Sequence, residues 1–182
     1  MKKIKAGILT MSDKGARGER EDKSGAAIKE LLATIGGKVE RYEVIPDEFE
    51  LIKRTLAAWC DLYRLDLIVT TGGTGFSPRD VTPEAAAAVI ERPAPGISEA
   101  MRLAGLAKTP HAMLSRGVSG IRGRTLIINL PGSEKGVRES LQAVLLALPH
   151  ALEILSGQGG ECGSNKGNPR PRSRKTGGRA RP

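Results

Sequence analysis

Four short runs of residues along the chain have the pattern of β-strands, and each ends at polar or glycine-rich residues. The first run, IKAGILTM, is apolar over most of its length and stops at Ser12 and Asp13. Short apolar runs bounded by turn-forming residues are typical of strands buried inside a sheet. The predicted strands are residues 4–11, 38–45, 66–71 and 125–130.

Between the predicted strands, apolar residues recur at the three- and four-residue spacing of helices. We expect Ser24 to cap the first helix and Asp47 to begin the second, with Glu50 completing a pattern that resembles a capping box. Thr82 is expected to cap the third helix, with Pro83 at its first position. The predicted helices are residues 25–37, 47–64, 84–91, 97–108, 134–148 and 150–157.

Two parts of the later chain have weaker patterns. Residues 115–124, SRGVSGIRGR, have the composition of a glycine-rich connection, and residues 112–114 form a weak strand-like run. Ser133 is placed to cap the helix that follows the fourth strand, and Pro149 is expected to interrupt that helix. The pattern contains no internal repeat. The 182 residues are enough for one sizeable core, so we expect one globular domain followed by a tail.

The order of the predicted elements indicates the fold class. Strands that alternate with helices are typical of a mostly parallel sheet covered on both faces, so we predict a three-layer α/β/α sandwich. In such a sheet the loops that follow the strands meet at the carboxyl edge, where ligands bind. The unusual residues fall in these loops: Ser12 and Asp13, Pro46 and Asp47, Gly72 to Asp80, and Pro131 to Ser133.

The stretch TTGGTGFSPRDVTPE concentrates glycine directly after the third strand. Gly72, Gly73 and Gly75 allow positive φ and remove side chains, so backbone N–H groups can converge on an anion such as phosphate. A tight turn without a ligand is the alternative. Two familiar phosphate motifs are excluded, because Phe76 stands where a P-loop has lysine and Pro78 where G-x-G-x-x-G has its third glycine.

Four carboxylates lie in or beside the same loops, namely those of Asp13, Asp22, Asp47 and Asp80. Each has a purely structural alternative: Asp47 can cap its helix, Asp80 can pair with Arg79 or orient its turn, and the other two can be solvated. Acids beside a phosphate site normally require a bridging Mg²⁺, because they would otherwise repel the ligand. The residues therefore indicate a Mg²⁺-assisted site for a phosphorylated or nucleotide ligand, and they leave the second substrate open.

Other kinds of chemistry find little support in the sequence. His111 and His150 are isolated and lack the Cys, His or Asp spacing of a zinc site, so we expect them to be surface or core residues. The chain has no G-x-S-x-G motif, which argues against a serine hydrolase of the elbow type.

The positive charge is concentrated at the end of the chain. Of the formal net charge of +9, residues 157–182 hold +6, because seven Lys and Arg residues and only one acid lie there. This segment is rich in Gly, Pro, Ser and Arg, so we predict a disordered basic tail behind a catalytic body formed by residues 1–156. The tail has no aromatic side chain for stacking on bases, so we expect a solvated or solubilising tail, and nucleic-acid binding through its basic charge is the alternative.

Three further features concern the location of the protein in the cell. Cys60 and Cys162 have no paired or metal-binding spacing, and the first apolar run is too short for a secretory leader. We therefore expect two free thiols and a cytoplasmic location. No stretch of the chain is long and apolar enough to span a membrane.

The stretch TTGGTGFSPRDVTPE, taken together with MSDKGARGEREDKSG, VIPDE, LSRG and LIINLPGS, resembles the molybdopterin-binding family, most closely its MogA/MoaB-like adenylyltransferases. The resemblance covers roughly residues 4–156, with the motifs in the right order. It implies the MogA-like fold and Mg²⁺-dependent transfer of AMP from ATP to the terminal phosphate of molybdopterin, with release of pyrophosphate, in molybdenum cofactor biosynthesis. A non-catalytic molybdopterin-binding or carrier protein of the same pathway is the alternative.

The resemblance also implies roles for individual residues. Asp47 and Asp80 match the family's functional aspartates and are expected to hold Mg²⁺ and set the phosphate geometry, directly or through water. Lys135 is placed where it could reach a phosphate, and a solvated lysine in the first turn of its helix is the alternative. The resemblance also implies a homotrimer, with a hexamer as the alternative because some relatives form hexamers. It further implies that the product is handed over to a metal-insertion protein. The residues expected around the bound ligands are Ser12, Asp13, Gly72, Gly73, Thr74, Gly75, Ser115, Pro131, Gly132 and Ser133.

Overall fold

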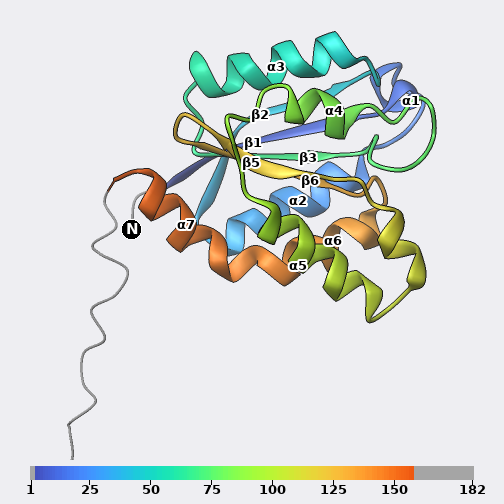
Figure 1. Cartoon of the computed structure of the whole chain (residues 1–182). Helices are drawn as coiled ribbons and strands as arrows, with labels where there is room; N and C mark the ends of the chain where they lie inside the picture. The colour runs from blue at the N-terminus through green and yellow to red at the C-terminus, as the bar shows by residue number, and fades with distance from the viewer. Residues whose placement is uncertain (1–2, 158–182) are drawn as a thin grey trace, which may run out of the picture.

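The strands of the sheet lie side by side in the order β2-β1-β3-β6-β5-β4 (Figure 1). The computed structural model describes residues 3–157. β2, β1, β3 and β6 are parallel, whereas β5 runs antiparallel to both β6 and β4. The sheet is therefore mostly parallel, as predicted. The strands are β1 (Ile4–Met11), β2 (Gly37–Ile45), β3 (Leu67–Thr71), β4 (Arg92–Pro93), β5 (Ser119–Arg122) and β6 (Thr125–Leu130).

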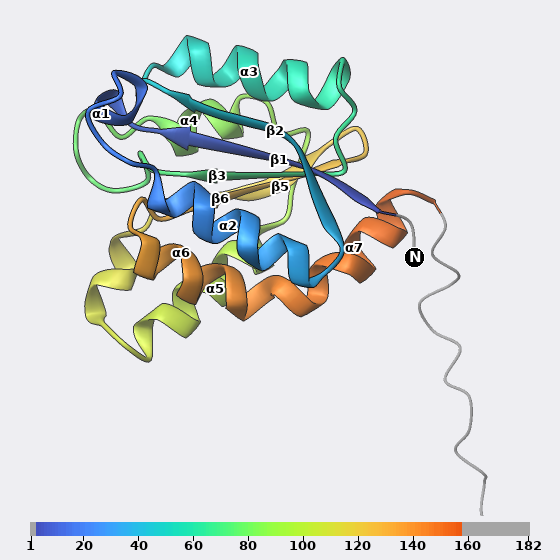
Figure 2. The same ribbon diagram turned by 180° about the vertical axis from the view of Figure 1, so that it is seen from behind.

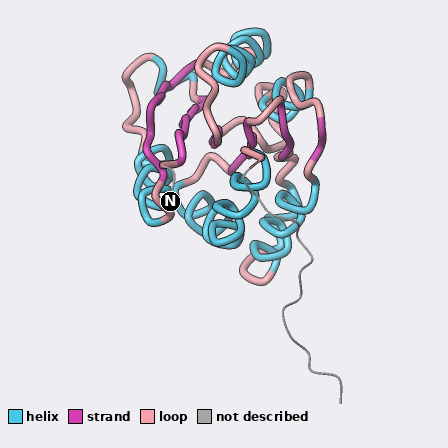
Figure 3. Tube along the Cα trace, turned by 90° about the vertical axis from the view of Figure 1, so that its left-hand side faces the viewer, coloured by secondary structure: helices cyan, strands magenta, loops and turns pink. Residues whose placement is uncertain are grey.

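Helices cover both faces of the sheet (Figure 1 and Figure 2). α3 and α4 pack on one face, and α2, α5, α6 and α7 pack on the other. In the view along the strands, the sheet lies between these two helical layers, which confirms the three-layer sandwich (Figure 3). The helices are α1 (Asp13–Ala16), α2 (Lys23–Thr34), α3 (Phe49–Asp61), α4 (Thr82–Ala87), α5 (Pro95–Leu106), α6 (Glu134–Val144) and α7 (Leu148–Leu155), with 3₁₀ helices η1 (Pro110–Leu114) and η2 (Leu145–Ala147).

Each face of the sheet has its own apolar core. Ile8 of β1 lies in one core with Ile28 of α2, and its neighbour Leu9 lies in the other core with Trp59 of α3. This alternation follows from the strand geometry, in which successive side chains point to opposite faces. β3 and β6 are buried along their whole length. The apolar runs of the sequence therefore mark strands with helices on both sides.

The four predicted strands are confirmed to within one residue at each end, but the edge of the sheet was predicted wrongly. Residues 112–114 belong to the 3₁₀ helix η1, and β5 lies inside the predicted glycine-rich connection. β5 forms a hairpin with β6 in which Arg122 pairs with Thr125. Gly123 has φ +55° in this two-residue turn. Pairing with β6 orders this short segment, whose local sequence resembles a loop.

The start of α2 differs from the prediction. Asp22 caps this helix by accepting a 2.8 Å hydrogen bond from the Gly25 N–H. Ser24, the predicted cap, lies inside the first turn and donates its hydroxyl to the carbonyl of Gly132 at 2.8 Å. Ser24 therefore ties α2 to the loop after β6, a contact between residues far apart in the sequence.

The predicted caps of α3 and α4 are also wrong, whereas the cap of α6 is confirmed. α3 begins at Phe49 and has no side-chain cap, so Asp47 lies outside it. Thr82 is the first residue of α4 rather than its cap. Ser133 caps α6 by accepting a 3.1 Å hydrogen bond from the Gly136 N–H. An interruption is present, but not at Pro149: α6 already ends at Val144, η2 separates it from α7, and Pro149 lies in the first turn of α7.

The topology places a crevice at the carboxyl ends of β1 and β3. The chain crosses from β1 to β2 on one side of β1 and later returns to β3 on the other side. A change of direction of this kind opens a space between the loops at the carboxyl edge, where α/β proteins bind ligands. In Figure 1 this edge is the end of the sheet near α1.

Three further predictions concern membrane spans, the basic tail and the cysteines. None of the helices within residues 3–157 has the length and apolar character needed to cross a membrane. The predicted basic tail lies outside the described residues, apart from Gly157. Cys60 is a buried free thiol, and burial raises its pKa to about 11. Cys162 belongs to the part of the chain that is not described.

Candidate active site

The carboxyl edge of the sheet brings together the loops that follow β1, β2, β3 and β6. These loops and the start of α2 surround an acidic cavity of about 760 Å³. We call the stretch from Gly72 to Asp80 the glycine loop; its two ends line this cavity through Gly72, Gly73 and Asp80. The predicted site residues that line the acidic cavity are Ser12, Asp13, Asp47, Gly72, Gly73, Asp80, Gly132 and Ser133.

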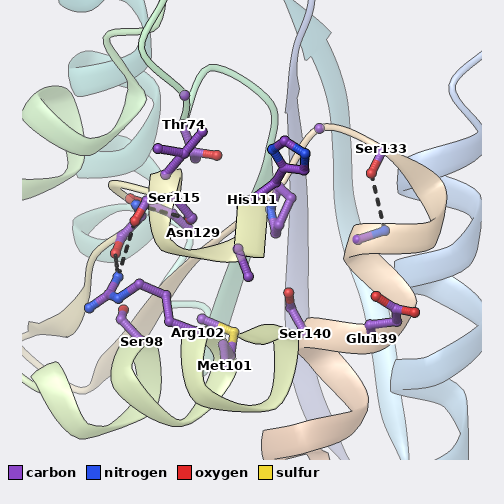
Figure 4. A pocket seen from close by; sticks show the side chains of 18 of the residues that line it. Thr74, Ser98, Met101, Arg102, His111, Ser115, Asn129, Ser133, Glu139 and Ser140 are labelled. Atoms are coloured by element: carbon purple, nitrogen blue, oxygen red, sulfur yellow. Dashed lines mark hydrogen bonds between the residues drawn. The ribbon is translucent and has the colours of Figure 1, made fainter. Parts of the chain in front are cut away.

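A second cavity of about 440 Å³ lies on the other side of the glycine loop, and we call it the helical cavity. Figure 4 shows Ser98, Met101 and Arg102 on α5, with Glu139 and Ser140 on the facing α6. The predicted site residues that line the helical cavity are Gly73, Thr74, Gly75, Asp80, Ser115, Pro131, Gly132 and Ser133. Every predicted site residue therefore lines at least one of the two cavities.

Four residues line both cavities and mark the place where they meet. They are Gly73, Asp80, Gly132 and Ser133. The loops after β3 and β6 touch there, because a Cβ at Gly132 would lie 3.2 Å from the Cα of Gly72. The hydroxyl of Thr71 donates to the carbonyl of Pro131 at 2.6 Å and holds the same two loops together.

The glycines of the glycine loop are required for different physical reasons. Gly72 has φ +93° and Gly73 has φ +61°, a region that side chains make unfavourable. A Cβ at Gly73 would also collide with the Thr82 hydroxyl and lie 2.9 Å from Oδ1 of Asp47. Gly75 does not have positive φ, but a Cβ there would lie 2.8 Å from Oδ2 of Asp80. Gly73 and Gly75 therefore leave room for the two candidate catalytic carboxylates.

Asp13 and Asp47 are linked by reciprocal hydrogen bonds. The Asp47 N–H donates to Oδ1 of Asp13 at 3.1 Å, and the Asp13 N–H donates to Oδ2 of Asp47 at 3.3 Å. Arg79 of the glycine loop donates to both carboxylate oxygens of Asp13, at 2.8 and 2.9 Å. One network therefore joins the loops after β1, β2 and β3, and the structural alternative that Asp47 caps α3 is wrong.

The two aspartates of this network have opposite pKa shifts. Hydrogen bonds from Arg79, and then from the Asp47 backbone, lower the pKa of Asp13. Burial, and then the negative charge of Asp13, raise the pKa of Asp47. Asp47 therefore binds a proton more readily than an ordinary aspartate, and a nearby cation would favour its ionised form.

Asp80 is oriented by the turn in which it lies. Its Oδ2 accepts a hydrogen bond from the Ser77 N–H at 3.0 Å, and its own N–H donates to the Ser77 carbonyl at 2.9 Å. Arg79 pairs with Asp13, so the alternative of an Arg79–Asp80 pair is not observed. Orientation of the turn, the other structural alternative, is observed and is compatible with a carboxylate that lines both cavities.

Asp22, the fourth predicted carboxylate, has structural partners around it. Besides capping α2, it accepts hydrogen bonds from the hydroxyls of Thr10 at 2.5 Å and Tyr42 at 2.6 Å. Burial, followed by these contacts with Asp22, raises the pKa of Tyr42. Asp22 lines the acidic cavity, yet its contacts are those of a residue that fixes the start of α2.

The carboxylates fit a Mg²⁺ ion that is shared with a substrate. No three His, Cys, Asp or Glu side chains among residues 3–157 form a group that could hold a metal by themselves. Mg²⁺ at phosphate sites is commonly bound by one or two carboxylates together with phosphate oxygens and water. Asp47 and Asp80 both approach the space left by glycines of the glycine loop, so they can supply that partial set of ligands.

Several residues at the site were not predicted from the sequence. Asn129 is buried in the helical cavity wall, where it donates to the Thr70 hydroxyl at 2.9 Å and accepts from the Val118 N–H at 3.2 Å. His111, expected to be a surface or core residue, is exposed and lines the same cavity. For Asn129, the available signal in the sequence was a polar residue inside the otherwise apolar strand TLIINL.

Lys135, the candidate for a phosphate contact, is exposed and lines neither cavity.

Comparisons with known proteins agree with this geometry. Residues 7–150 match the model of a family described as a probable molybdopterin binding domain. The chain is 45% identical over 159 residues to molybdopterin adenylyltransferase of Helicobacter pylori, covering 86% of this chain and 90% of that protein. It is 36% identical over 171 residues to molybdopterin adenylyltransferase of Escherichia coli, covering 86% and 88%.

A solved structure is similar over the same region. The molybdopterin biosynthesis enzyme MoaB of Thermus thermophilus superposes with a TM-score of 0.81 at 58% sequence identity. The similarity covers 85% of this chain and 97% of that one. Since the family model matches most of the chain and these relatives are similar over nearly their whole length, the protein belongs to the molybdopterin-binding family, within its MogA/MoaB-like group.

Proposed function

We propose that this protein is a molybdopterin adenylyltransferase of molybdenum cofactor biosynthesis, which uses ATP. An oxygen of the terminal phosphate of molybdopterin attacks the α-phosphorus of ATP. The bond from that phosphorus to the bridging oxygen breaks, so AMP is transferred and pyrophosphate leaves. The names of the relatives at 45% and 36% identity support the reaction.

The observation that carries this proposal is the junction of the two cavities. Each cavity is large enough for one substrate, and the two cavities share Gly73, Asp80, Gly132 and Ser133. Substrates that enter from opposite sides would bring their phosphates together at these residues. Holding the attacking oxygen next to the α-phosphorus accounts for much of the rate of such a transfer, because neither reactant has to be positioned at the moment of reaction.

The residues at and around the junction suit phosphoryl chemistry. The glycine loop, with Thr74, and the turn of Pro131 and Gly132 would approach the phosphates closely, while Ser12, Ser115 and Ser133 would offer hydroxyl groups. Asp47 and Asp80 would hold Mg²⁺ together with phosphate oxygens. When bound there, the ion would neutralise phosphate charge in the ground and transition states. No covalent nucleophile from the protein is required.

A non-catalytic molybdopterin carrier is the second candidate. It would keep a pocket for molybdopterin but would not need carboxylates for turnover. Asp47 and Asp80 both line the acidic cavity, and Asp80 lines the helical cavity as well. This placement favours the enzyme.

The first experiment measures pyrophosphate release from ATP and Mg²⁺, with and without purified molybdopterin, for the wild type and Asp80→Asn. We expect release that requires molybdopterin and Mg²⁺ and falls by about 10²- to 10³-fold in the variant, with unchanged melting temperature. Wild-type turnover by Asp80→Asn would remove Asp80 from the mechanism. Tight molybdopterin binding without any release by the wild type would identify a carrier.

The family resemblance also supports proposals about the assembly and its surroundings. The protein would form a homotrimer in the cytoplasm and hand adenylylated molybdopterin to a metal-insertion protein. Analytical ultracentrifugation of the full chain tests the trimer, and a monomer at micromolar concentration would contradict it. Deleting residues 158–182 should leave pyrophosphate release unchanged, since the proposed catalytic body ends near residue 156.

A further inference from the structure

Arg116 lies in the connection between η1 and β5, and its side chain reaches across to the glycine loop. Its Nε donates to the carbonyl of Gly75 at 2.7 Å, and one terminal nitrogen donates to the carbonyl of Asp80. The other terminal nitrogen pairs with the carboxylate of Glu84 in the first turn of α4. A single guanidinium therefore closes the segment from Gly75 to Asp80 at both of its ends.

The backbone around Arg116 is itself anchored to the helical cavity. The Arg116 N–H donates to the carbonyl of Thr74 at 2.9 Å. Arg102 of α5 donates to the carbonyls on either side of Arg116, those of Ser115 at 3.5 Å and Gly117 at 3.0 Å. The dashed contacts of Arg102 in Figure 4 belong to this anchor. The guanidinium of Arg116 thus connects the glycine loop to a wall that is fixed from α5.

The contacts of Arg116 fix the position of the turn, whereas the local contacts of Asp80 fix only the orientation of its carboxylate. The hydrogen bonds between Asp80 and Ser77 orient the carboxylate within its own turn. They do not fix the turn relative to the two cavities, because Ser77 belongs to the same exposed segment. Arg79 ties the turn to Asp13 beside the acidic cavity, and Arg116 supplies the second external reference, at the wall of the helical cavity. A lysine could not replace Arg116, since only the planar guanidinium presents several donors in fixed directions at once.

We infer that Arg116 is a positioning residue for Asp80, holding the glycine loop so that the Asp80 carboxylate stands at the junction of the two cavities. Its donors are directed at protein carbonyls and Glu84, and it lines neither cavity. It therefore acts through Asp80 rather than on a substrate. The inference rests on the proposed function, in which Asp80 takes part in adenylyl transfer.

The test compares Arg116→Lys with Arg122→Lys. Arg122 is a matched control, because it too pairs with a carboxylate, Asp61 at 2.7 Å, and a carbonyl, Val89 at 3.3 Å, but lies away from the site. We expect kcat for pyrophosphate release to fall by about 10- to 100-fold in Arg116→Lys, with little change in KM for ATP or molybdopterin. Arg122→Lys should keep wild-type kcat. The amides of residues 75–80 should exchange hydrogen faster only in Arg116→Lys.

A double-mutant cycle with Asp80→Asn, measured under single-turnover conditions, separates the inference from the proposed function. If Arg116 acts through Asp80, Arg116→Lys lowers the rate much less in the Asp80→Asn background than in the wild type. Equal fold losses in both backgrounds, or unchanged kcat and amide exchange in Arg116→Lys, would overturn the inference. Wild-type turnover by Asp80→Asn alone would instead overturn the role of Asp80 in the proposed function. If the Asp80→Asn rate is too low to measure, amide exchange decides between the outcomes.

Discussion

Asp13 and Asp47, 34 residues apart in the sequence, each donate a backbone N–H to the carboxylate of the other. The pair joins the loops after β1 and β2, and Arg79 adds the glycine loop to it. Two carboxylates held this close repel each other, and only Asp13 has a guanidinium directly on it. Arg79 therefore compensates the charge of Asp13 directly, whereas Asp47 makes no ion pair among residues 3–157.

The raised pKa of Asp47 predicts a pH-dependent gain in stability for Asp47→Asn. Folding disfavours the ionised form, so the variant should melt about 1–3 °C higher than the wild type at pH 7.5. In acid the gain should disappear, because Asp47 is then protonated in both the folded and unfolded states. It should grow as the pH rises through the folded-state pKa. Thermal melts between pH 3 and pH 8 measure it.

Asp13→Asn is the control with the opposite sign. Arg79 lowers the pKa of Asp13, so folding favours the ionised carboxylate and the substitution should lower the melting temperature at neutral pH. The difference from the wild type should shrink as the pH falls through the folded-state pKa of Asp13. Equal shifts of the same sign in the two variants would contradict this account of the pair.

Gly73→Ala should destabilise the protein more than Gly18→Ala. Both glycines have positive φ, +61° and +73°, so each substitution costs about 1–2 kcal/mol of backbone strain. Only at Gly73 does the new Cβ meet Thr82 and Asp47, whereas nothing lies within 4 Å at Gly18. This overpacking adds about 1–3 kcal/mol. Urea denaturation of both variants measures the difference, and equal costs would refute the close approach at Gly73.

Gly75→Ala should lower activity without lowering stability much. The backbone at Gly75 is compatible with alanine, so the free energy of unfolding should change by less than about 1 kcal/mol. The added Cβ lies 2.8 Å from Oδ2 of Asp80 and displaces that carboxylate. Pyrophosphate release should fall by about tenfold or more. Gly96→Ala, where the Cβ meets nothing within 4 Å, should keep wild-type release.

Thr82→Val should be neutral or stabilising. The Thr82 hydroxyl is the buried side-chain polar atom within residues 3–157 that has no hydrogen-bond partner, so an isosteric methyl group removes an unsatisfied donor. Thr125 is the matched control, since its equally buried hydroxyl donates to the carbonyl of Leu65 at 2.5 Å. Thr125→Val should cost about 1–2 kcal/mol. Chemical denaturation gives both values, and a larger loss at Thr82 would reveal a partner for its hydroxyl.

The long elements could be predicted from the sequence because their signals are local. IKAGILTM and TLIINL are recognisable as strands, since both faces of the central sheet are covered and nearly every residue is apolar. β5 was missed because SGIR is short and contains glycine, and its pairing with β6 gives it order. Ser24 and Asp47 were assigned to helix caps because local rules cannot tell a cap from a side chain that bonds to a distant loop.

The same division applies to the site. The residues that gather at the carboxyl edge were predictable, because loops after parallel strands must meet there and the motifs identify the family. Which of them touch was not, since this depends on how α5, α6 and the loops pack. The two cavities are built from loops of several elements, and the Asp13–Asp47 pair and the Arg116 contacts join residues at least 30 positions apart. Consecutive residues set the strands, helices and turns, but such contacts form only when the folded chain brings distant segments together.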